Sequence, residues 1–147
     1  MNNATMNNRV RDVMNSWPEV MDADATVAEA AQLMREKSIG DVMVVEGEAD
    51  NRLYGILTDR DIVVRAIAEG LDPTKTRIGD ICSRKLTTVS PDHGVGHAMR
   101  VMRAKAIRRL PVAEAGQVIG VLTIGDIAVE RDAGSALADI SAAPRNT

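Results

Sequence analysis

Aromatic residues are almost absent from this chain, which has no Phe, one Trp and one Tyr. A buried core must therefore be built from Val, Ile, Leu, Met and Ala, which suits closely packed helices and strands. Stacking platforms for nucleic-acid bases are missing, and a formal net charge of −3 offers no basic surface for a phosphate backbone. Nucleic acid is therefore not an expected partner.

Cysteine and long apolar segments are equally scarce. Cys82 is the only cysteine, which excludes an internal disulfide and a cysteine-rich metal site. The longest clearly apolar run, Val42 to Val45, is far too short to span a bilayer. The polar N-terminus has no apolar stretch of the kind found in signal peptides. We therefore expect a cytoplasmic protein without a membrane segment.

An internal duplication is the main feature that the sequence does contain. Asp80 corresponds to Asp12, an offset of 68 residues. Beyond the turn at 114–117 the offset falls to 65, because the second repeat has three residues fewer at this turn. Further pairs at the first offset are Val27 and Val95, Ala30 and Ala98, Met34 and Met102, Lys37 and Lys105, and Ile39 and Ile107.

Each repeat is predicted to be a β-α-β-β-α unit preceded by a short helical turn. In the first repeat we expect this turn at 9–14, an extended piece at 19–23 and strands at 42–45 and 53–57. One helix follows a capping box formed by Thr26 and Glu29, and a second spans 59–69 and ends at Gly70. The expected buried helix positions are Val27, Ala30, Ala31, Met34, Ile62, Val63, Ala66 and Ile67.

These repeats define the predicted domain organisation. Residues 1–8 form a flexible leader, 9–70 the first repeat, 71–77 a linker, 78–131 the second repeat and 132–147 a polar tail. A unit of this size is too small to bury its sheet alone. We therefore expect an α/β (α+β) fold in which two β-α-β-β-α repeats pack face to face with pseudo-twofold symmetry.

One motif, G-h-h-T-x-x-D with h apolar, recurs at the same place in both repeats. It reads GILTDRD from Gly55 to Asp61 and GVLTIGD from Gly120 to Asp126. Each copy ends a strand and begins a helix, whose first backbone N–H groups are available to a phosphate. The alternative is a plain capping box, in which the Thr and Asp satisfy only each other's backbone groups. Thr26 and Glu29 indicate that the chain uses such boxes for structure alone.

The duplicated unit resembles a tandem pair of CBS domains, a regulatory module. The resemblance covers residues 9–131. The whole chain is also similar in layout to free-standing two-domain CBS proteins of actinobacteria, including the hypoxic-response type. Because the motifs occur twice with matched spacing, they are more specific than one motif alone. The motifs that carry the resemblance are the opening turn at Asp12 to Met14, the KSI and KAI segments at 37–39 and 105–107, the LPV strand at 110–112 and both G-h-h-T-x-x-D turns.

The resemblance implies that adenine nucleotides or other adenosyl ligands bind in clefts between the two halves. The final Asp of each turn would accept hydrogen bonds from the ribose hydroxyls. The Thr and the N–H groups after it would meet a phosphate, and the Gly would let the ligand approach the strand. The residues assigned to these roles are Gly55, Thr58, Asp59, Arg60 and Asp61 in the first repeat and Gly120, Thr123, Ile124 and Asp126 in the second.

The base would lie against the first strand of each repeat, near Val20 and Thr88, and against Ile39 and Ile107. Beside these positions the two copies are unequal, so we expect different affinities. Arg60 stands where the second repeat has Gly125, Arg108 and Arg109 stand where the first has Gly40 and Asp41, and Pro111 stands where the first has Met43.

Several other residues have plainer expected roles. His93 and His97 have the spacing of a two-histidine metal face, but no third ligand is evident, so solvated histidines are expected. Trp17 is expected to anchor its loop, and Cys82 to be buried.

The function expected from these observations is a non-enzymatic sensor of an adenine nucleotide, such as ATP or AMP, or of another adenosyl ligand. No catalytic pair, metal site or bound cofactor is expected beyond this regulatory ligand. The resemblance also implies a homodimer of CBS pairs. Whether a further protein partner binds is left open by the sequence. The alternative is a ligand-independent homodimeric interaction scaffold.

Overall fold

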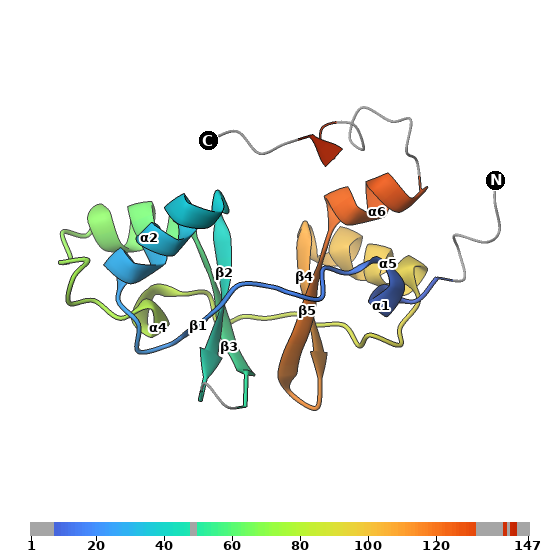
Figure 1. Cartoon of the computed structure of the whole chain (residues 1–147), viewed down its shortest axis with the longest axis horizontal. Helices are drawn as coiled ribbons and strands as arrows, with labels where there is room; N and C mark the ends of the chain where they lie inside the picture. The colour runs from blue at the N-terminus through green and yellow to red at the C-terminus, as the bar shows by residue number, and fades with distance from the viewer. Residues whose placement is uncertain (1–7, 48–49, 132–139, 141, 144–147) are drawn as a thin grey trace. The chain divides into compact units, whose positions relative to one another are not determined.

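The computed structural model describes residues 8–47, 50–131, 140, 142 and 143. The described chain divides into two compact units, one formed by residues 19–86 and the other by residues 8–18 together with 87–131 (Figure 1). The predicted leader, except for Asn8, and most of the predicted tail lie outside the described residues. In the described part of the chain, no helix has the length and apolar character needed to cross a membrane.

The unit formed by residues 19–86 is a three-stranded sheet with helices on one side (Figure 1). Strand β1 runs parallel to β2, and β2 runs antiparallel to β3, with Val20 opposite Met43 and Val44 opposite Gly55. The elements are β1 (Val20–Asp22), α2 (Val27–Lys37), β2 (Asp41–Glu46), β3 (Arg52–Thr58), α3 (Asp59–Asp61), η2 (Ile62–Ile67) and α4 (Ile78–Ile81).

The core of this unit follows the predicted periodicity, with two corrections. Buried residues come from α2, from alternate positions of β2, and from β3, η2 and α4. The expected burial of Ala31 was wrong, because this residue is exposed on α2. Val63 and Ile67 are 59% and 53% exposed. The core members are Val27, Ala30, Met34, Val42, Val44, Leu57, Ala66, Ile78, Ile81 and Cys82.

The segment that carries Val63 and Ile67 is not a regular α-helix. Only the first turn after Thr58 is an α-helix, and it continues as the π-helix η2. The N–H of Ala68 bonds to the carbonyl of Val63 at 2.9 Å, which is an i to i+5 pairing. Residues four apart still share a face of this segment: Ile62 and Ala66 face the core, whereas Val63 and Ile67 lie together on its exposed side. The apolar spacing alone therefore did not show which of the two pairs is buried.

The second unit is built on a two-stranded antiparallel ribbon. Val112 lies opposite Gly120 in the pairing of β4 with β5. Val10, Val89, Val95, Leu110 and Leu122 are among the residues of its core. The elements are α1 (Val10–Val13), α5 (Val95–Lys105), β4 (Arg109–Glu114), β5 (Gln117–Thr123) and α6 (Ile124–Arg131).

The opening segments of the two repeats are exchanged between the compact units. The segment after α1 pairs with β5, since Asn15 and Val121 exchange backbone hydrogen bonds of 2.9 and 3.0 Å. The segment after α4 pairs with β3 in the same way, through Ser83 and Ile56 at 2.9 and 3.0 Å. The repeats at 9–70 and 78–131 are therefore units of sequence, whereas each packing unit takes its opening helix from the other repeat.

The expected first strand forms fully only in the first repeat. There the N–H of Met43 donates to the carbonyl of Glu19 at 2.9 Å, which extends the pairing of β1. Pro111 occupies the equivalent position in the second repeat and has no N–H to donate. The first strand is consequently reduced to a bridge between Val89 and Val112.

The C-terminal ends of the two long helices give a stability prediction. Ala106 ends α5 with φ of 54°, a left-handed conformation that favours glycine. We expect Ala106→Gly to raise the free energy of unfolding by about 0.5–1 kcal/mol, because the Cβ strain is removed. Ala104→Gly, at an exposed position inside α5, should lower it by about as much. Urea unfolding followed by circular dichroism measures both; a loss for Ala106→Gly would contradict this reading.

Candidate functional site

The turn after β3 is a complete capping box. The Thr58 hydroxyl accepts a hydrogen bond from the Asp61 N–H at 3.1 Å, and the Asp61 Oδ2 accepts one from the Thr58 N–H at 2.9 Å. The other carboxylate oxygen of Asp61 lies 3.8 Å from Nε of Arg65. An ionised carboxylate has about four acceptor positions, so capping and binding of a ligand hydroxyl are compatible.

The turn after β5 repeats this arrangement in the other unit. Thr123 and Asp126 form the same two hydrogen bonds, again at 3.1 and 2.9 Å. In both turns, the first N–H after the Thr donates to the carbonyl of the residue that directly precedes the neighbouring strand. The Asp59 N–H donates to the Gly40 carbonyl at 2.9 Å, and the Ile124 N–H donates to the Arg108 carbonyl at 2.9 Å. The two turns therefore share one backbone design.

The structure gives a different reason for the two glycines of the motif than the one expected. A Cβ on Gly55 would lie 2.6 Å from Sγ of Cys82 and 2.7 Å from the carbonyl oxygen of Ser83. A Cβ on Gly120 would lie 2.6 Å from Sδ of Met14 and 2.8 Å from the Asn15 carbonyl oxygen. The space over each glycine is filled by the exchanged opening segment and is not left open for a ligand.

The side chains beside the two turns differ in charge. In the first repeat Asp59 Oδ1 accepts a hydrogen bond from the Arg60 N–H at 2.8 Å. Asp41 lies opposite Thr58 in the strand pairing, while Arg109 lies opposite Thr123 in the second repeat. Arg60, Arg108 and Arg109 all expose their side chains. The two turns therefore share one backbone geometry but have differently charged side chains beside it.

The residues predicted to contact a base are less uniform. Val20, Ile39 and Ile107 are half-buried, Pro111 is buried and Thr88 is exposed. Val20 also lines a cavity of about 570 Å³ between β1 and α2. The lining of this cavity includes no residue of 55–61 or 120–126, so it is separate from the two T-x-x-D turns.

Two features near the turns were not found from the sequence. Cys82 packs against Gly55, as its repeat counterpart Met14 packs against Gly120, and the offset of 68 residues was the available signal. Burial raises the pKa of the Cys82 thiol, as fits the expected buried role. The guanidinium of Arg84 lies 3.7 Å from the centre of the Tyr54 ring, and no sequence pattern indicated this contact.

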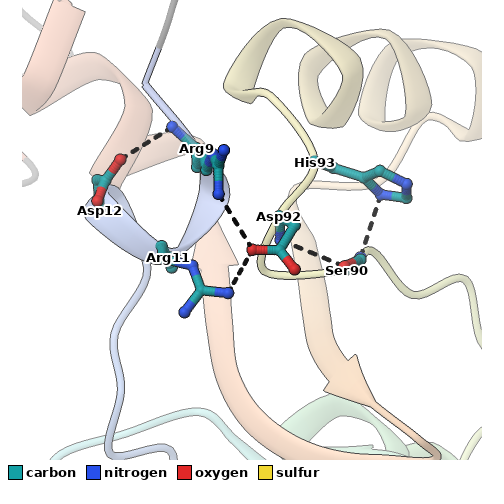
Figure 2. Close-up of polar contacts among 6 residues, drawn as sticks. All are labelled: Arg9, Arg11, Asp12, Ser90, Asp92 and His93. Carbon is teal, nitrogen blue, oxygen red and sulfur yellow. Dashed lines mark hydrogen bonds and ion pairs between the residues drawn. The ribbon is translucent and has the colours of Figure 1, made fainter.

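A polar cluster fastens α1 to the loop before α5 (Figure 2). Arg11 and Arg9 both pair with Asp92, the latter at 3.5 Å, and Asp92 raises the pKa of Arg11 through a hydrogen bond and charge attraction. The Ser90 N–H donates to Nδ1 of His93 at 3.1 Å. The cluster is exposed and structural, because it ties together two segments of one unit.

The two histidines and Trp17 complete the set of expected residues. The rings of His93 and His97 lie 4.4 Å apart between centroids, with His93 exposed and His97 half-buried. Among the described residues, no group of three or more His, Cys, Asp or Glu could hold a metal ion. The expectation for Trp17 was wrong, because its side chain is 87% exposed and anchors nothing in the described structure.

Comparison with known proteins identifies relatives of the whole repeat pair. The chain is 35% identical over 136 residues to the CBS domain-containing protein YhcV of Bacillus subtilis, covering 90% of this chain and 94% of the relative. It is 36% identical over 118 residues to hypoxic response protein 1 of Mycobacterium tuberculosis, covering 80% and 81%.

Solved structures share the fold. The crystal structure of Hypoxic Response Protein I with two coordinated zinc ions matches with a TM-score of 0.74 and 34% identity, over 82% of this chain and 97% of that chain. The CBS domain pair of protein MJ0100, solved with 5′-methylthioadenosine and S-adenosyl-L-methionine, matches with a TM-score of 0.70 and 28% identity, over 82% and 93%.

The family model for the CBS domain matches the chain twice, at residues 10–67 and 78–131. These bounds agree with the duplication found from the sequence, and the mixed α/β fold is the one expected for it. The chain belongs to the CBS-domain family and carries a tandem pair of these domains.

Proposed function

We propose that this protein is a regulatory module that binds an adenosyl ligand at its T-x-x-D turns. The observation that carries the proposal is the repetition of one arrangement, in which Thr, Asp and a preceding carbonyl have matching hydrogen-bond lengths in both units. A relative of the same fold, the CBS pair of MJ0100, binds 5′-methylthioadenosine and S-adenosyl-L-methionine.

Each turn offers the chemistry that an adenosyl ligand requires. Asp61 and Asp126 remain acceptors after capping, and a carboxylate suits the two vicinal hydroxyls of a ribose. A hydrogen bond to a charged group contributes about 1.5–3 kcal/mol at best. Half-buried Ile39 and Ile107 provide apolar surface for the base in the first and second unit, respectively.

The regulatory output is proposed to pass through a second copy of the chain or another protein. Val63, Val64 and Ile67 of η2 expose apolar side chains, as do Ile124 and Val129 of α6. Exposed apolar side chains of this kind favour contact with another protein surface, here that of a second copy. A ligand can shift such an assembly only by as much as it prefers one arrangement over another. A non-enzymatic, cytoplasmic role is part of the same proposal.

The alternative is a ligand-independent scaffold. Each capping box is complete without a ligand, since both Thr and both Asp residues already bond to backbone groups. A turn that serves only as a cap would look the same, so the scaffold remains the second candidate.

A thermal-shift screen tests the proposal. We expect at least one of AMP, ADP, ATP, NAD and S-adenosylmethionine at millimolar concentration to raise the melting temperature, because a ligand that binds only the folded state stabilises it. No rise with any of the five would contradict the proposal and favour the scaffold.

A further inference from the structure

The two turns can be compared residue by residue, because their backbones are equivalent. The carbonyls of Gly40 and Arg108 each hold the first N–H of the following helical turn, both at 2.9 Å. Side chains at positions 40 and 108 therefore start from the same place beside the turn. The residue that follows the Thr is Asp59 in the first repeat and Ile124 in the second.

In the first repeat, the carboxylate of Asp59 lies beside the N–H groups that a bound anion would need. Asp59 Oδ1 takes the Arg60 N–H at 2.8 Å, one of the first N–H groups of the turn. Its Oδ2 lies 3.2 Å from the point where a Cβ on Gly40 would be, so this carboxylate covers the glycine. A phosphate placed here would have to displace Asp59 and would meet a charge of its own sign.

In the second repeat the same two positions favour an anion. Ile124 places no carboxylate on the N–H that follows it, and Arg108 adds a guanidinium where the first repeat has no side chain. Arg108 is exposed, so its guanidinium is accessible to a ligand. Guanidinium groups form strong bidentate hydrogen bonds with phosphate.

The two arginines near the first turn, Arg60 and Arg65, do not make this turn favourable for a phosphate. Arg65 is directed to the other end of the turn, where its Nε lies 3.8 Å from Asp61 and its Nη1 donates to the Ile81 carbonyl at 3.1 Å. Arg60 exposes its side chain, and its backbone N–H is already held by Asp59.

From this geometry, and resting on the proposed function, we infer that the two turns select different adenosyl ligands. The Thr123 turn accepts a phosphorylated ligand, with Arg108 as the specificity-determining residue. The Thr58 turn rejects phosphate, because Asp59 acts as a built-in anion, and accepts only adenosyl compounds without one.

Isothermal titration calorimetry of the full chain tests this with two probes, AMP and 5′-methylthioadenosine, which share base and ribose and differ in the phosphate. We expect one AMP and two molecules of 5′-methylthioadenosine per chain. Arg108→Gln should weaken AMP binding about tenfold or more, as loss of a charge-assisted hydrogen bond predicts, and change the affinity for 5′-methylthioadenosine less than about twofold. Arg100→Gln, an exposed arginine on α5, is the matched control and should change neither.

Asp59→Asn provides the reciprocal test. The amide retains an oxygen for the Arg60 N–H but removes the charge, so a second AMP site should appear. Unchanged AMP binding by Arg108→Gln, or an equal loss caused by Arg60→Gln, would overturn the assignment while leaving the proposed function intact. Absence of binding by both probes to the unmodified chain would overturn the assignment, and the proposed function would fall with it only if the thermal-shift screen were negative for all five ligands.

Discussion

Gly55→Ala is expected to lower the free energy of unfolding by about 1–3 kcal/mol, the cost of overpacking a well-filled site. The new methyl group would lie 2.6 Å from Sγ of Cys82 and 2.7 Å from the Ser83 carbonyl oxygen. That carbonyl accepts the Ile56 N–H at 3.0 Å, so it cannot move without losing a strand-like hydrogen bond. Urea unfolding followed by circular dichroism measures the loss.

The chain offers two controls for this substitution. Gly96→Ala places a methyl group on α5 at 3.7 Å from Nη1 of Arg100, an ordinary contact distance, and should stabilise the protein by about 0.5–1 kcal/mol. Gly120→Ala meets the flexible side chain of Met14 and the Asn15 carbonyl, and should also destabilise. If Gly55→Ala and Gly96→Ala had the same effect, the packing role of the motif glycine would be refuted.

Asp126→Ala is expected to abolish the AMP-induced rise in melting temperature. The substitution removes the acceptor of the Thr123 N–H, which costs about 0.5–2 kcal/mol of stability as a lost cap. It also removes the carboxylate proposed to accept the ribose hydroxyls, so AMP should no longer stabilise the folded state. Thermal-shift titration with AMP measures both effects in one experiment.

A second capping box separates the two roles of Asp126. Thr26 and Glu29 form the same pair of hydrogen bonds at the start of α2, at 3.0 and 3.2 Å. Glu29→Ala should therefore lower stability by a comparable amount and leave the AMP response intact. A full AMP response in Asp126→Ala would show that the Asp is only a cap.

The parts of the fold that depend on local chemistry could be predicted from the sequence. Capping residues such as Thr26 and Glu29 fixed a helix start, and the turn glycine Gly70 marked a helix end with φ of 73°. The duplication itself located both T-x-x-D turns, because matched residues at a constant offset occupy matched places in the fold.

The remaining features depend on contacts between distant segments, which local patterns do not encode. The pairing of Asn15 with Val121 joins residues far apart in sequence, so the exchange of opening segments was not foreseen. The same exchange supplied the reason for Gly55 and Gly120. At the site, the capping geometry was predictable, whereas the position of Asp59 over Gly40 required the structure.

An AMP titration of the full chain followed by two-dimensional amide NMR tests the central claim most directly. The proposed ligand role of the repeated turn predicts chemical-shift changes concentrated at Thr123 to Ile127 and at Arg108. Changes confined to Val20, Leu33 and the other residues that line the β1–α2 cavity, or no changes at all, would contradict it.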